Sequence, residues 1–165
     1  MMWMPFNLVL LLLAPLTLSH AAMPSLEAET LTGEKVRLPE LWLGQPAVVV
    51  WSFSREAGEG IKAWMAALER EGVNAWGAAV LEKAPRFVRP MIRREMRGDI
   101  PKQFHSRTIC FYRGDKELRE TLGVGDDRLP LVVMLGANGA IVWKHSGLYE
   151  EAARSELMDR WRRLF

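Results

Sequence analysis

The chain has a single cysteine, Cys110, among its 165 residues. One cysteine cannot form an internal disulfide, a two-cysteine redox motif or a zinc site built on several thiolates. The sequence also lacks the run of about 20 apolar residues that a membrane-spanning helix needs. Lys and Arg number 22 and Asp and Glu number 20, so the net charge of +2 is too small for a dedicated nucleic-acid binder.

Other chemical motifs are missing as well. There are three histidines, and His105 and His145 have no histidine, cysteine or carboxylate at the spacing of a metal site. Asp126 and Asp127 lie in a glycine-flanked turn without the alternating ligands of a calcium loop. No glycine-rich phosphate loop, serine nucleophile elbow or pair of catalytic acids is visible. We therefore expect no metal and no cofactor.

The N-terminal residues have the pattern of a targeting signal. Residues 6–18 form an apolar run too short to span a bilayer, and Ser19 and Ala21 supply small residues before a cleavage site. This pattern predicts a signal peptide over residues 1–21, and an exported, periplasmic or otherwise extracytoplasmic protein beginning near Ala22. An uncleaved membrane anchor is the alternative, because no Lys or Arg precedes the apolar run. No cysteine follows it, which excludes a lipoprotein anchor.

Strand and helix patterns alternate along residues 22–165. Predicted strands cover residues 26–30, 35–38, 47–53, 73–81, 108–112, 131–135 and 140–144. Helical spacing covers residues 61–68, 86–97, 116–122 and a closing segment from about residue 150. This order predicts one α/β domain, a three-layer sandwich around a central mixed β-sheet.

The order of these elements resembles the thioredoxin superfamily. A buried strand at residues 47–53 leads into a loop and a helix, where thioredoxins carry their redox motif. Leu129 and Pro130 precede the strand at residues 131–135, where the superfamily keeps a cis-proline. Residues 136–147 resemble the hairpin that follows that proline in secreted thioredoxins. The resemblance implies a thioredoxin-like domain over residues 22–165 and a cis Leu129–Pro130 bond, able to expose backbone to an extended client strand.

Short stretches also resemble the mitochondrial ATP synthase assembly factor ten family, which has a thioredoxin-like fold without a redox pair. These stretches are residues 50–54, 92–94 leading to 100–101, 118–120 followed by Gly123, and 141–143 leading to 146–147. The family acts as a chaperone in assembling a membrane ATPase sector. The resemblance implies a non-redox, chaperone-like role toward a protein client, such as a membrane-protein complex.

The loop after the first long strand decides whether dithiol chemistry can occur. Residues 54–60 contain no sulfur, so thiol–disulfide exchange by a cysteine pair at this loop is excluded by composition. Ser54 is a candidate N-cap of the following helix. Two interpretations stay open: a loop that only caps the helix, or a binding surface that includes Ser54, Arg55 and Glu56.

Cys110 is the one residue on which an enzyme could depend. It lies in a predicted strand between Ile109 and Phe111, the setting of a small buried hydrophobe and not of a reactive thiolate. The sequence therefore favours a non-catalytic protein that binds polypeptides as an assembly factor or chaperone-like adaptor. A one-cysteine thiol oxidoreductase using Cys110 is the alternative.

Positive charge gathers in residues 83–107, which contain eight Lys and Arg and two acids. Arg86, Arg89, Arg93 and Arg97 follow one another at spacings of 3, 4 and 4, which places them on one face of a helix. This face is either solvated or a docking surface for an acidic protein or anionic lipid headgroups. In both cases, exchanging Arg89 and Arg93 for Glu should leave the melting temperature nearly unchanged. With a docking role, association should also weaken.

Overall fold

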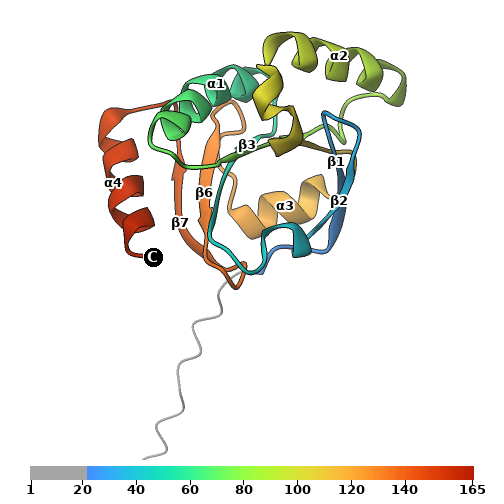
Figure 1. Cartoon of the computed structure of the whole chain (residues 1–165). Helices are drawn as coiled ribbons and strands as arrows, with labels where there is room; N and C mark the ends of the chain where they lie inside the picture. Colours follow the sequence, from blue (N-terminus) through green and yellow to red (C-terminus); the bar gives the residue numbers. More distant parts are fainter. Residues whose placement is uncertain (1–21) are drawn as a thin grey trace, which may run out of the picture.

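Seven strands form one mixed sheet in the order β2-β1-β5-β4-β3-β6-β7 in the computed structural model, which describes residues 22–165 (Figure 1). The strands are β1 (Leu26–Thr30), β2 (Lys35–Leu38), β3 (Ala47–Ser52), β4 (Trp76–Val80), β5 (Thr108–Phe111), β6 (Leu131–Leu135) and β7 (Ile141–Ser146). The helices are α1 (Arg55–Arg70), α2 (Arg89–Asp99), α3 (Asp115–Leu122) and α4 (Glu151–Arg162), with 3₁₀ segments η1 (Glu40–Trp42), η2 (Arg86–Val88) and η3 (Lys102–Arg107). The predicted signal peptide, residues 1–21, lies outside the described residues.

The sheet is mixed, as the sequence predicted. β3, β4 and β5 run parallel, whereas β1, β2, β6 and β7 pair antiparallel with their neighbours. The helices that connect the parallel strands explain why β3 and β4 are apolar on both faces. None of the helices within residues 22–165 is long and apolar enough to cross a membrane.

Helices cover both faces of the sheet and make three layers. All six residues of β3 are buried, and successive side chains point to opposite faces. Val48 and Val50 pack in one cluster with residues of α1 and α4. Val49 and Trp51 pack in a second cluster with residues of α3. The α/β sandwich predicted from the sequence is therefore confirmed.

The basic segment begins later than the helical spacing indicated. A helix was expected over residues 86–97, either kinked at Pro90 or beginning there, and the chain forms the 3₁₀ turn η2 before α2, which begins at Arg89. Pro90 lies in the first turn of α2, where its missing N–H removes no helical hydrogen bond. Met96 and Ile100 pack beside Leu31 and Cys110, so α2 covers the β1 end of the sheet (Figure 1).

The candidate site lies along the edge of the sheet formed by the carboxyl-terminal ends of the parallel strands. Because β3, β4 and β5 are parallel, the loops that follow them leave from the same edge, the upper one in Figure 1. β6 starts and β7 ends there, because Leu131 lies opposite both Trp51 and Ser146. Ligands of open α/β sheets bind beyond the carboxyl ends of the strands. This edge is therefore the first place to look for a site.

Candidate functional site

Ser54 fixes the start of α1 at this edge. Its backbone is extended, and its hydroxyl oxygen accepts a hydrogen bond from the Ala57 N–H at 3.1 Å, so the predicted N-cap is confirmed. The same hydroxyl donates to the Asp127 carbonyl at 2.6 Å. Ser54 therefore both caps α1 and ties it to the loop at residues 123–130.

Arg119 fixes that loop from the other side. Its guanidinium donates to the Asp127 carboxylate at 3.1 Å and to the Asp115 carboxylate at 2.9 Å. It also lies over the Phe53 ring, 5.0 Å from the centroid. A half-buried arginine bound to two carboxylates and an aromatic face loses little freedom when a ligand arrives. The loop beside Ser54 is thus prearranged by its own chain.

The predicted cis bond before Pro130 is wrong. Within residues 22–165 the cis bond is Leu38–Pro39, and Leu129–Pro130 is trans. The trans form is intrinsically preferred before proline, so tertiary contacts must favour the cis form for it to occur. Here the Pro130 ring packs directly against α1, and the Pro130 carbonyl accepts a hydrogen bond from the Gly147 N–H at 3.0 Å. Strand pairing through a cis Leu129–Pro130 bond is therefore not available.

Gly60 makes that close approach of α1 to Pro130 geometrically possible. A Cβ on Gly60 would lie 2.9 Å from Pro130 Cγ and 3.0 Å from Leu148 Cδ2, closer than ordinary packing allows. The sequence shows Gly60 only as a glycine near a helix start. Its role depends on a residue 70 positions away, which no local pattern could reveal.

The surface around these contacts combines charge with apolar groups. Arg55, Glu56 and Arg128 are exposed, and the Arg55 side chain is 89% accessible, with Glu95 of α2 4.0 Å away. Leu148 is 56% exposed and Leu129 is half-buried.

Arg128 donates three hydrogen bonds to Asp126, which hold the pKa of that carboxyl below its usual range. The structure therefore brings the predicted residues Ser54, Arg55, Glu56, Leu129 and Pro130 to one edge.

Cys110 is buried and far from reactive. It is fully inaccessible in β5, between Leu31 and Ala79 in a small apolar cluster. Burial raises the pKa of the Cys110 thiol to about 11. A thiol in this state is almost entirely protonated at neutral pH and is a poor nucleophile.

Burial of Cys110 predicts a loss of stability at alkaline pH. Because its folded-state pKa lies above the unfolded value, its contribution is complete below about pH 9 and is lost as the pH rises toward 11. The shift corresponds to about 2–3 kcal/mol at most. Urea unfolding measured from pH 8 to pH 11 should show this decline in the wild type. The decline should be shallower in Cys110→Ala, and equal slopes would show that Cys110 does not contribute.

The predicted basic face turns partly inward. Arg93 donates to the Glu29 carboxylate at 2.7 Å and to the Thr30 carbonyl at 3.1 Å. Arg97 donates to the Leu31 carbonyl at 2.8 Å. These carbonyls lie where β1 ends and need hydrogen-bond donors. Arg93 and Arg97 therefore take part in internal contacts and are not wholly solvated, and the docking role of this face stays a prediction.

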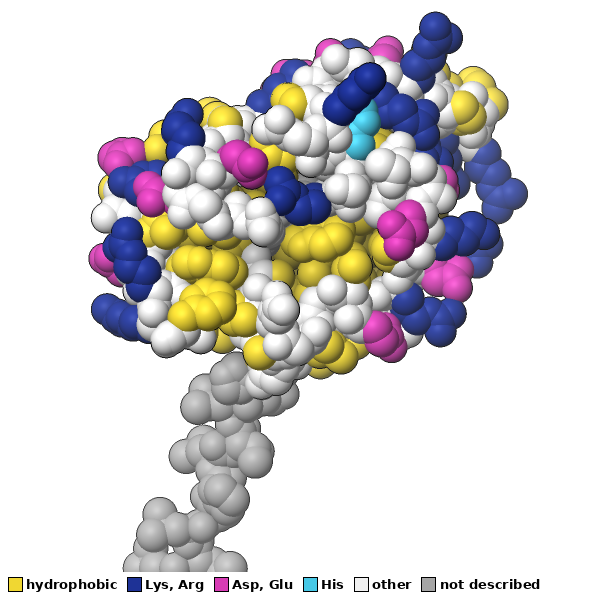
Figure 2. Space-filling model, in the orientation of Figure 1, with side chains coloured by type: hydrophobic (Ala, Val, Ile, Leu, Met, Phe, Trp, Pro, Cys, Tyr) yellow, Lys and Arg dark blue, Asp and Glu magenta, His cyan; other side chains and the backbone are white. Residues whose placement is uncertain are grey.

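Arg89 also has internal partners, whereas the Arg86 side chain has none within the described residues 22–165. The Arg89 guanidinium donates to the Ala84 and Glu82 carbonyls, both at 3.0 Å, and lies over the Tyr112 ring. Arg86 is exposed. Lys and Arg side chains gather over this part of the molecule, at the upper right of Figure 2.

Within residues 22–165, no group of three or more His, Cys, Asp or Glu side chains is arranged to bind a metal.

Comparison with known proteins identifies the architecture. No family model and no curated protein sequence matches the chain. Solved structures do match: the exposed lipoprotein thioredoxin Etrx1 of Streptococcus pneumoniae has a TM-score of 0.60 at 13% identity, over 83% of this chain and 99% of its own. BsSco, of the Sco family of cytochrome c oxidase assembly proteins, has a TM-score of 0.63 at 12% sequence identity, and the match covers 88% of this chain and 94% of BsSco. Yeast Sco1 has a TM-score of 0.62 at 12% sequence identity, and the match covers 88% of this chain and 97% of Sco1.

The fold is thioredoxin-like. At these identities the likeness establishes the fold and no activity. In this thioredoxin-like chain, α1 follows β3 and starts at Ser54, in a loop without sulfur.

The Arg119, Asp127 and Gly60 contacts that shape the site were not predicted from the sequence. An arginine and an aspartate eight residues apart give no signal until the fold brings them together.

Proposed function

We propose that this chain is an exported, non-redox thioredoxin-fold protein that binds another polypeptide at the edge formed by the start of α1 and the loop before β6. The observation that carries the proposal is the prearranged, sulfur-free junction of Ser54 with Asp127. The hydroxyl and Arg119 fix the shape of the surface, and Arg55, Glu56 and Arg128 are exposed around it. A rigid surface of this kind binds with a smaller loss of conformational entropy.

The position of the one thiol supports a non-redox role. Cys110 is buried in β5, and the junction itself contains no sulfur. Thiol–disulfide exchange needs an accessible thiolate and a second thiol that resolves the mixed disulfide. Neither requirement is met at this edge of the sheet.

The structural neighbours support an assembly role. BsSco belongs to a family of cytochrome c oxidase assembly proteins. Together with the expectation from the short sequence motifs, this likeness favours a client that is part of a membrane-protein complex. The apolar N-terminal run favours an extracytoplasmic location for the domain.

The composition of the surface indicates what a client segment should contain. Leu148 and Leu129 supply apolar contact, whereas Arg55, Glu56 and Arg128 supply charges of both signs around it. Central apolar contacts surrounded by polar groups are the usual anatomy of a protein interface. We therefore expect an extended client segment with an apolar residue flanked by charged ones.

Site-specific photo-crosslinking in living cells tests the proposal. A photoreactive amino acid placed at Arg55 or Leu148 should give the same crosslinked protein from both positions. The same probe at Arg37 on the edge strand β2, also well exposed, is the matched control and should not capture it. The partner is identified by mass spectrometry, and its binding is then measured with both proteins purified.

Charge reversal gives the second half of that test. Arg55→Glu combined with Arg128→Glu should weaken binding of the purified partner at least tenfold, while the loss of the exposed Arg128–Asp126 contact lowers the melting temperature by no more than a few degrees. Equal crosslinking from Arg37, or unchanged affinity in the double variant, would contradict binding at this edge.

A further inference from the structure

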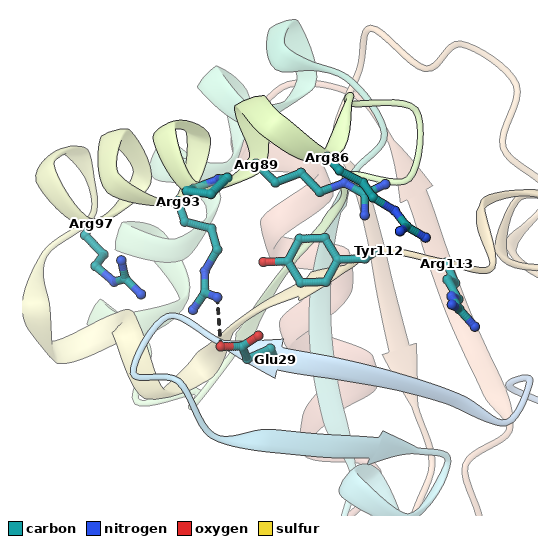
Figure 3. A pocket seen from close by; sticks show the side chains of 8 residues that line it. Glu29, Arg86, Arg89, Arg93, Arg97, Tyr112 and Arg113 are labelled. Carbon is teal, nitrogen blue, oxygen red and sulfur yellow. Dashed lines mark hydrogen bonds and ion pairs between the residues drawn. The ribbon is translucent and has the colours of Figure 1, made fainter.

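A second feature of the same edge is a basic pocket between α2 and the β1–β5 side of the sheet (Figure 3). The cavity measures about 520 Å³. Its charged and polar lining consists of five arginines, one tyrosine and one carboxylate. They are Arg86, Arg89, Arg93, Arg97, Arg113, Tyr112 and Glu29.

Three of the arginines are positioned by backbone carbonyls. Arg89 donates to two carbonyls of the loop after β4, Arg97 donates to the Leu31 carbonyl, and Arg93 adds the Thr30 carbonyl to its contact with Glu29. A carbonyl orients a guanidinium but does not neutralise it. Arg89 and Arg97 are therefore fixed in place while their charge remains available, whereas the charge of Arg93 is paired with Glu29.

The remaining two arginines add charge without any internal partner. Within residues 22–165, the side chains of Arg86 and Arg113 form no hydrogen bond and no ion pair, and both residues are exposed. Figure 3 shows both on the side of the pocket where the Tyr112 ring lies. Glu29 is the only acid among the lining residues, so five positive charges face one negative charge.

Free donors also remain on the positioned arginines. Arg97 donates a hydrogen bond only from its Nε, so both of its terminal nitrogens can still donate to a ligand. Arg89 donates from Nε and Nη2, so its Nη1 can still donate. The Arg93 Nε is buried without a hydrogen-bond partner. Guanidinium groups with adjacent free N–H donors match the oxygens of phosphate and carboxylate groups in a bidentate manner.

We infer that this pocket binds a phosphate group carried by a ligand with more than one negative charge. The net charge of the lining is what separates phosphate from carboxylate. A single carboxylate would neutralise one of four excess positive charges, whereas a phosphate monoester or a diphosphate neutralises two or more. The inference is independent of the proposed polypeptide surface, which uses other residues.

Two sources could supply such a group, a soluble phosphate compound or the headgroup of an anionic phospholipid. Isothermal titration calorimetry with inorganic pyrophosphate tests the first. Co-sedimentation with vesicles of phosphatidic acid, whose headgroup is a phosphate monoester, and phosphatidylcholine, against pure phosphatidylcholine vesicles, tests the second. Binding in either assay should weaken as the salt concentration rises.

Charge-matched variants locate the binding. Arg86→Gln with Arg113→Gln removes two unpaired charges of the pocket and should weaken binding at least tenfold. Arg70→Gln with Arg94→Gln removes two exposed charges outside the pocket lining and should change the affinity less than twofold. Circular dichroism should show that both double variants melt within a degree or two of the wild type.

The outcomes separate cleanly. Pyrophosphate binding that is lost in the pocket variant supports a soluble phosphate ligand. Vesicle binding alone, with the same loss, supports a lipid headgroup. The proposal is overturned if neither probe binds, or if the two double variants weaken binding equally.

Discussion

The Arg89→Glu/Arg93→Glu double variant is expected to melt well below the wild type, by about 6–12 °C for a loss of about 3 kcal/mol in a domain of this size. Arg93 is only 14% exposed and donates charge-assisted hydrogen bonds to Glu29 and to the Thr30 carbonyl. A glutamate in its place would put two carboxylates side by side and leave the carbonyl without a donor. The expectation reverses the one from the sequence, in which these arginines face outward.

The control is a charge reversal on the same helix but away from the sheet. Arg94 is exposed and does not line the pocket, so Arg94→Glu should change the melting temperature by no more than a few degrees. Thermal unfolding followed by circular dichroism measures both. A double variant as stable as Arg94→Glu would mean that the Arg93 contacts contribute little to folding.

Trp64→Ala should be still more damaging, with a loss of about 3–5 kcal/mol. Trp64 is fully buried on the inner face of α1 and packs with β3, β6 and α4 in one cluster. Its indole N–H donates to the Gly147 carbonyl at 3.0 Å, and Tyr149 packs edge-on against the ring. One side chain therefore connects α1 to the segment that follows β7.

Trp64→Phe separates the two contributions of the indole. The phenyl ring keeps most of the apolar volume but cannot donate to the Gly147 carbonyl, so it should lose about 1–2 kcal/mol. Urea unfolding monitored by far-UV circular dichroism gives both values. If Trp64→Phe were as unstable as Trp64→Ala, the hydrogen bond would outweigh the packing, contrary to the expectation.

Much of the fold was predictable because local patterns decide it. β3 is a continuous run of β-branched and aromatic residues, and Asn138 with Gly139 marks the turn between β6 and β7. The N-cap at Ser54 follows from residue type and position alone. These features depend on neighbours in the sequence, and the structure reproduces them within a few residues.

The features that were missed depend on residues far apart in the chain. Helical spacing shows that four arginines share a face, but it does not show that the Thr30 and Leu31 carbonyls lie opposite that face. The Leu129–Pro130 bond was predicted from family resemblance. Its trans form instead accompanies the contacts of Pro130 with Gly60 and Gly147.

The central claim is that this thioredoxin fold works without thiol chemistry, and titration of Cys110 in the native protein tests it most directly. Because burial raises the pKa of that thiol to about 11, its thiolate fraction at pH 7.5 is about a hundredfold below that of a free cysteine. A chromogenic disulfide reagent should therefore label the native protein at least about a hundredfold more slowly than the urea-unfolded chain. Complete labelling of the native protein within seconds would contradict the claim and favour an enzyme that uses Cys110.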